Sequence, residues 1–296
     1  MNRAIVTAFH KYTPFGDQYY EPIFKHFMDQ MNRYRDEFDR LYILDSNWGV
    51  TDVPSWTTVI KVNPHLRYFD AYKEVLPQIK EDLVLLLDND FLIYRKGIIN
   101  HVFFIIEQDH RLPDHVPYDA VSIIDNIGTY KTDKLKNGNK MCPYLFATRK
   151  ELLMKYKNIE WGDHMPHSET LGLLTEAMLN DNLRPYELEE DKSNILFDGT
   201  QDGEKSKDLG YYHIRSGSLP AYLLATRAEG DRKTYEDYLK HQPKTEYLRQ
   251  FAWFWVMGGS KYMDRDLMTE LGVDYAEWLQ YIEKFRAYYG LNKNGF

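Results

Sequence analysis

The sequence predicts an α/β protein with a doubly wound mixed sheet, helices on both faces of that sheet and a C-terminal helical extension. Its first half alternates short apolar runs of strand length with segments in which apolar residues recur every three or four positions. From residue 219 onward the spacing of apolar residues is helical. Because continuous apolar runs are typical of strands covered on both faces, we expect parallel strands joined by helical crossovers.

The individual elements can be assigned in chain order. Strands are expected at residues 4–9, 41–44, 57–62, 83–87, 118–124 and 144–148. Helices are expected at residues 20–34, 68–79, 150–157 and 169–179. A further helix is expected from the amphipathic stripe of Tyr275, Trp278, Leu279, Ile282, Phe285 and Tyr289. We therefore expect a sheet domain over residues 1–218 and a helical extension over residues 219–296.

The composition excludes several classes of protein. The 296 residues include 37 Lys and Arg against 45 Asp and Glu, a net charge of −8 with no basic block, which argues against a nucleic-acid partner. Cys142 is the one cysteine, so neither an intrachain disulfide nor a multi-cysteine zinc site is expected. No apolar run approaches a membrane span, and no signal-peptide pattern opens the chain. We expect a soluble, cytoplasmic protein.

The strongest chemical signal is Asp88-Asn89-Asp90, which directly follows the apolar strand expected at 83–87. Two carboxylates separated by one residue at the end of a buried strand can converge on one point, and carboxylate oxygens suit Mg²⁺ or Mn²⁺. The alternative is a simple turn, because Asp and Asn are common turn residues. Negative charge at the end of a wholly apolar strand is costly without a nearby cation, which favours a metal site.

The order of strand, Asp-x-Asp and a second apolar segment (Phe91–Tyr94) resembles the metal-binding segment of GT-A-fold glycosyltransferases. The resemblance covers roughly the first 215 residues, in the order of elements more than in identity. It implies a GT-A-like catalytic domain that binds a nucleotide-diphosphate sugar, UDP- or GDP-linked, through Mn²⁺ or Mg²⁺. The sugar would pass to a carbohydrate or small hydroxyl acceptor.

The resemblance also implies roles for individual residues. The metal ligands would be Asp88 and Asp90, completed by the late His213, whose alternative is simple packing between strand neighbours. Arg215 would neutralise phosphate charge. The remaining donor-site residues would be Thr7, Phe9, Asp45, Arg67, Asp70 and Asn89.

An inverting transfer needs a base that deprotonates the acceptor hydroxyl. The resemblance implies Glu169, at the start of the helix expected at 169–179, with Asp163 as its substitute. The alternative for Glu169 is a favourable interaction with the helix dipole. Whether the transfer is retaining or inverting stays open. The C-terminal helices are expected to pack on the catalytic domain, to help form the acceptor cleft or to make a homo-oligomer contact.

Two other functions remain open at this stage. The first is a phosphatase of the haloacid-dehalogenase type, whose Asp-x-Asp normally lies on the first strand and is followed by Thr or Val. Here three expected strands precede the strand that the motif follows, and Leu92 stands where Thr or Val would be. The second is a catalytically inactive GT-A-like module that binds carbohydrate or nucleotide.

Overall fold

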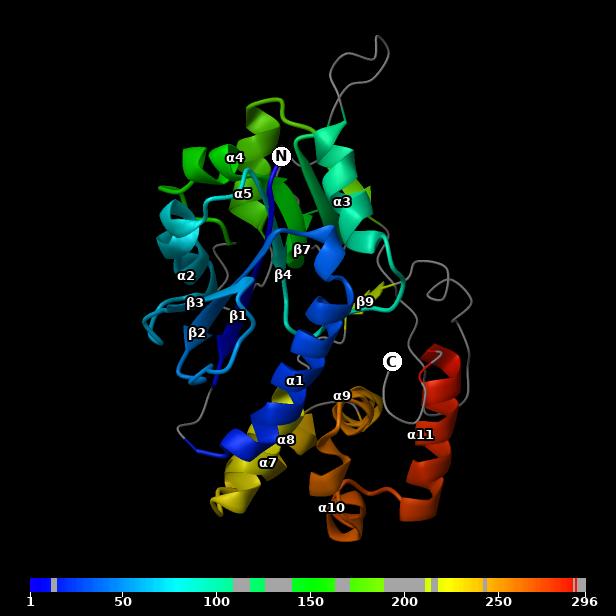
Figure 1. Ribbon diagram of the computed structural model, residues 1–296. Coiled ribbons are helices and arrows are strands. Elements are labelled where there is room, and N and C mark those ends of the chain that lie inside the picture. The colour runs from blue at the N-terminus through cyan, green and yellow to red at the C-terminus, as the bar shows by residue number, and fades with distance from the viewer. Residues whose placement is uncertain are drawn as a thin grey trace. The chain divides into compact units, whose positions relative to one another are not determined.

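The structure is a computed structural model (Figure 1). It describes residues 1–11, 15–108, 118–125, 140–162, 171–188, 211–213, 218–241, 244–289 and 291. The chain forms two compact units, each described here by itself. Unit 1 comprises Met1–His10, Tyr34–Asp88 and Arg95–Glu190, and unit 2 comprises Lys11–Arg33, Asn89–Tyr94 and Asp191–Phe296. The domain boundary expected at residue 218 stays a prediction.

Unit 1 contains a seven-stranded mixed sheet with the strand order β3-β2-β1-β4-β7-β6-β8. β7 is antiparallel to β4 and to β6, and every other pairing is parallel. All strands except β7 therefore end at the same edge of the sheet, the edge at which open α/β sheets bind ligands. The strands are β1 (Arg3–His10), β2 (Arg40–Ser46), β3 (Thr57–Lys61), β4 (Leu83–Leu87), β6 (Ala120–Asp125), β7 (Lys140–Arg149) and β8 (Pro185–Leu188).

Helices cover both faces of this sheet, as expected from the sequence. On one face, α2 (Tyr68–Val75), α4 (Lys150–Lys155) and α5 (Gly172–Asn180) share a hydrophobic core with alternate residues of β1, such as Ala4 and Val6. The other face carries α3 (Ile98–Glu107), where the Arg3 guanidinium lies 5.4 Å from the centre of the Phe103 ring. Successive side chains of a strand point to opposite faces, so α3 and α2 lie on opposite sides (Figure 1). Short 3-10 turns at Arg35–Glu37 and Leu76–Gln78 join these elements.

Unit 2 combines helices with a two-stranded antiparallel sheet. Its N-terminal helix α1 (Asp17–Arg33) packs against α7. Within the described part of the chain, the segment from residue 219 is helical, as expected. The other elements of the unit are β5 (Phe91–Ile93), β9 (Tyr211–His213), α7 (Leu219–Ala228), α8 (Arg232–His241), α9 (Lys244–Val256), a 3-10 turn (Gly259–Tyr262), α10 (Arg265–Glu270) and α11 (Tyr275–Tyr289).

Several expected bounds differ from the observed ones: the helix expected at 68–79 ends at Val75, and the strand expected at 144–148 runs from Lys140 to Arg149. Trp278, Ile282 and Phe285 of α11 are buried, but Leu279 is 40% exposed because it lies one residue off the buried face. The helix expected from residue 169 begins three residues later, at Gly172. Leu171, the residue before α5, has non-helical backbone angles (φ −85°, ψ 43°), and its N–H donates to the carbonyl of Met141 in β7 (2.8 Å). Among the described residues, none of the helices is both long and apolar enough to cross a membrane.

Candidate functional site

The acidic motif begins where the buried strand β4 ends. All five residues of β4 are buried, and the backbone N–H of Asp88 donates to the carbonyl of Tyr144 in β7 (3.1 Å). The Asp88 carboxylate accepts a hydrogen bond from the phenol of Tyr68, the first residue of α2. The Tyr68 hydroxyl also lies 3.1 Å from the hydroxyl of Tyr72. Unit 1 therefore presents the Asp88 carboxylate at the ligand-binding edge of its sheet, held by a side chain that the sequence analysis missed.

The two phenols are neutral donors. Desolvation of the hydroxyl, which lies between Tyr72 and Asp88, raises the pKa of Tyr68 above 10 although the residue is 37% exposed, and the negative charge of Asp88 raises it further. Burial, followed by the same charge, also raises the pKa of Tyr72. Both hydroxyls therefore stay protonated at neutral pH. Tyr68 orients the Asp88 carboxylate without bringing positive charge to it.

In unit 2, Asn89 and Asp90 lead directly into strand β5. Asp90 is only 7% exposed. β5 pairs antiparallel with β9, and Phe91 lies opposite His213. The backbone of the late histidine is therefore a direct neighbour of the residue that follows Asp90. The structure describes the backbone of His213 and not its side chain, and among the side chains that are described, no three of His, Cys, Asp or Glu are grouped as metal ligands.

Asp45 ends up beside Phe9, its partner in the β1–β2 register. Its carboxylate is 1% exposed and accepts hydrogen bonds from three backbone N–H groups of the following loop, those of Trp48 (2.8 Å), Gly49 (3.1 Å) and Val50 (2.8 Å). Lys61 forms an ion pair with the same carboxylate.

Burial opposes ionisation of Asp45, but the bonds from Lys61 and the loop N–H groups outweigh it and lower the pKa. Asp45 therefore orders the loop after β2. The position of Asp45 at the end of β2 is thus accounted for by its hydrogen bonds to the loop that follows the strand.

Around this loop the structure brings together further residues of the same sheet edge. The Trp48 ring packs edge-on against Phe9, with ring centres 5.0 Å apart. The His10 Nδ1 atom lies 2.9 Å from the Ser46 hydroxyl oxygen, and burial lowers the pKa of His10. Thr7 is fully buried, and its hydroxyl has no hydrogen-bond partner within the described part of the chain. The sequence indicated no role for Ser46 or Trp48, apart from their position after the strand expected at 41–44.

Arg67 and Asp70 belong to a separate, exposed group. The Arg67 guanidinium binds Asp70 and Glu160, each at 2.9 Å, and these acids raise its pKa. Asp70 also pairs with Lys73 (2.7 Å). Arg67 precedes α2, which covers the sheet face opposite to the one that Phe9 faces. The expected donor-site residues of unit 1 therefore form two groups, one on each face of the sheet. The expected site residues Asp163, Glu169 and Arg215 lie outside the described residues.

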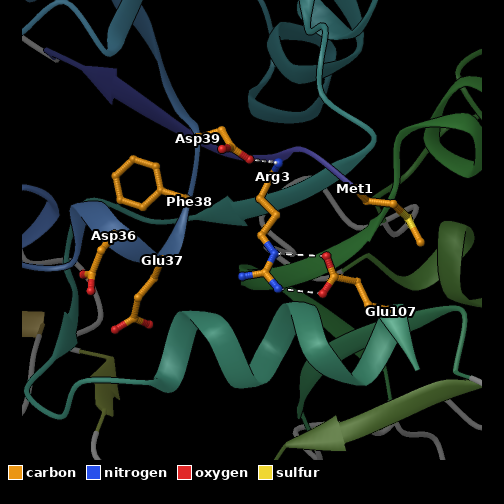
Figure 2. A pocket seen from close by; sticks show the side chains of 7 residues that line it. All are labelled: Met1, Arg3, Asp36, Glu37, Phe38, Asp39 and Glu107. Carbon is orange, nitrogen blue, oxygen red and sulfur yellow. Dashed lines mark hydrogen bonds and ion pairs between the residues drawn. The ribbon is translucent and has the colours of Figure 1, made fainter. Parts of the chain in front are cut away.

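Unit 1 also contains an open pocket of about 520 Å³ near the start of β1. Figure 2 shows Arg3 between two of the acids that line it: Glu107 accepts two hydrogen bonds from the guanidinium (3.0 and 2.6 Å), and Asp39 accepts one from the Arg3 backbone (2.7 Å). Glu37 accepts bonds from the backbone of Gly97 (2.7 Å) and Asn100 (3.0 Å) at the start of α3. These pairings hold β1, α3 and the turn before β2 together, at the end of the sheet away from Asp88. We attribute a structural role to this pocket.

Comparisons with known proteins give a likeness of fold. No family model matches the sequence, and a search of curated proteins finds none similar to it. Among solved structures, the chain is similar to 4-diphosphocytidyl-2C-methyl-D-erythritol synthase from Anaerococcus prevotii (11% identity, 70% of this chain and 92% of that chain, TM-score 0.41).

It is also similar to glucosyl-3-phosphoglycerate synthase from Mycobacterium tuberculosis (14% identity, 64% and 70% of the chains, TM-score 0.38). A third structure is the glycosyltransferase GlyE of Streptococcus pneumoniae (14% identity, 63% and 45% of the chains, TM-score 0.35). Because all three TM-scores are below 0.5, the case for a function rests on this chain's own residues.

Proposed function

We propose that this protein is a metal-dependent glycosyltransferase that moves a sugar from a nucleotide-diphosphate donor to an acceptor hydroxyl. The observation that carries the proposal is the pairing of β5 with β9, in which Phe91 lies opposite His213. The resemblance implies that a late histidine joins the acidic pair, although more than a hundred residues separate them. The pairing makes that histidine a backbone neighbour of the segment that carries Asp90.

The donor set fits a hard divalent cation. Carboxylate oxygens are the ligands that Mg²⁺ and Mn²⁺ prefer, and an imidazole nitrogen suits Mn²⁺ as well. Asp90 is 7% exposed, and a carboxylate in such a position is stabilised by an added positive charge. Asp88, Asp90 and His213 would hold the ion. When bound, it would offset the negative charge that builds on the leaving diphosphate.

Other residues would orient a metal ligand, deprotonate the acceptor and bind the donor. Tyr68 orients the Asp88 carboxylate through its hydrogen bond. We assign the acceptor base to Glu169, with Asp163 as its substitute, and we assign compensation of phosphate charge to Arg215. The residues proposed for the donor nucleotide are Thr7, Phe9, Asp45, Arg67, Asp70 and Asn89, with Asp45 acting through the loop that it orders.

Calorimetry with UDP- and GDP-sugars, with and without Mn²⁺, tests the proposal. We expect nucleotide-sugar binding that requires Mn²⁺ in the wild type and falls at least tenfold in Asp90→Asn. Asp29→Asn is the matched control, because Asp29 is an exposed acid of the same unit that pairs with Lys25 in a surface bridge. Metal-dependent binding that survives in Asp90→Asn would contradict the assignment. Phosphate release from a generic phosphoester, without nucleotide-sugar binding, would point instead to a phosphatase.

A further inference from the structure

A single glutamine holds the strand that follows the acidic motif. Gln30 lies on the buried face of α1 and is only 4% exposed, among apolar neighbours such as Phe27 and Met31. Its side-chain Nε2 donates to the carbonyl of Phe91 (2.9 Å), and its Oε1 accepts from the backbone N–H of Ile93 (2.8 Å). The side-chain amide thus bonds to β5 as the peptide group of an adjacent strand would.

These two bonds occupy the side of β5 that faces away from β9. In a strand, the N–H and C=O groups of alternate residues point to opposite sides. Since Phe91 and Ile93 point to Gln30, the backbone groups of Leu92 point to its register partner Tyr212 in β9. A two-stranded sheet is marginal by itself. Gln30 supplies the contacts of a third strand, so β5 is held on both sides.

We propose that Gln30 is a positioning residue for the acidic motif: its two hydrogen bonds anchor β5 to α1 and thereby fix the place of Asp90, the residue directly before the strand. Asp90 lies in the turn that enters β5, so the position of its carboxylate depends on where the strand is held. Gln30 holds the strand through one backbone carbonyl and one backbone N–H two residues apart. The role in metal binding rests on the proposed function.

The test compares Gln30→Met with Phe27→Leu, a control on the same buried face of α1. Gln30→Met keeps the length of the side chain and removes both hydrogen bonds. Three quantities are measured in each protein: Mn²⁺ affinity from the electron paramagnetic resonance signal of the free ion, melting temperature, and the hydrogen-exchange rate of the Ile93 amide. Should Gln30→Met not fold, Gln30→Glu, which keeps the acceptor for Ile93, receives the same measurements.

We expect Gln30→Met to weaken Mn²⁺ binding about tenfold, as the loss of outer-shell partners of metal ligands typically does. Exchange of the Ile93 amide should accelerate, while Phe27→Leu lowers the melting temperature and leaves Mn²⁺ affinity unchanged. Equal Mn²⁺ affinity in Gln30→Met and the wild type would overturn the positioning role and leave the proposed function standing. Absence of Mn²⁺ binding in the wild type would instead overturn the proposed function, and the metal role of Gln30 with it.

Discussion

Replacing Asp45 with Asn removes the charge that orders the loop after β2. The best orientation of the amide keeps an oxygen toward the N–H groups of Trp48 and Gly49, which both bond to Oδ1. The amide nitrogen then faces the N–H of Val50 and the ammonium of Lys61, which both bond to Oδ2 in the wild type. The variant therefore loses one buried, charge-assisted hydrogen bond and one ion pair.

The magnitude follows from these two losses. A hydrogen bond to a charged group contributes about 1.5–3 kcal/mol. The ion pair adds little, because the Lys61 side chain is 67% exposed and solvent screens it. We expect Asp45→Asn to lower the free energy of unfolding by about 2 kcal/mol at pH 7. Asp52→Asn, an exposed change in the same loop, should stay within about 0.5 kcal/mol.

The effect should depend on pH. The pKa of Asp45 is lowered in the folded state, so its stabilisation is fully present above its ordinary pKa of 3.8 and is lost as the pH falls through the lower, folded value. Urea unfolding of both proteins at pH 7 and near pH 3 measures the difference. The difference in unfolding free energy between the wild type and Asp45→Asn should be smaller at the lower pH. A difference that is the same at both pH values, or below about 0.5 kcal/mol at pH 7, would refute the role of the charge.

Two further predictions concern unit 1. Tyr68→Phe keeps the ring and removes the hydrogen bond to Asp88. The Mn²⁺ affinity should therefore fall about tenfold, with little change in melting temperature. An unchanged Mn²⁺ affinity would show that Tyr68 does not orient Asp88. Glu37→Ala removes the buried acceptor for Gly97 and Asn100 at the start of α3 and should cost about 2 kcal/mol in urea unfolding. Asp36→Ala is the control, because the exposed salt bridge between Asp36 and Lys96 should contribute little to the free energy of unfolding. An equal loss of unfolding free energy in the two variants would contradict the role assigned to Glu37.

Elements with continuous apolar runs could be predicted from the sequence alone. The strand expected at 83–87 is β4, residue for residue; the one expected at 4–9 is one residue shorter than β1 at each end, and the one expected at 57–62 is one residue longer than β3. A buried strand carries its own signal, because every residue in it is apolar. The start of α5 could not be predicted in this way, because Leu171 continues the apolar spacing of the helix and yet lies outside it.

The site could be predicted only in part, for a similar reason. The motif around Asp88 has a local signature, a carboxylate pair after an apolar run. Gln30 has none, because periodicity counts apolar residues and treats a polar residue on a buried face as a gap. Three of the partners of Asp45 are backbone N–H groups, which every residue except proline carries, so the sequence did not indicate that its carboxylate orders a loop.

Crystals soaked with Mn²⁺ and a UDP- or GDP-sugar would test the central claim most directly, through anomalous scattering from the metal. The account predicts an anomalous peak bound to the carboxylates of Asp88 and Asp90 and to the imidazole of His213, at ligand distances of about 2.0–2.5 Å. The donor diphosphate should lie against the same peak. A soak that leaves the motif without a peak, or a peak only at the acids around Arg3, would contradict the account.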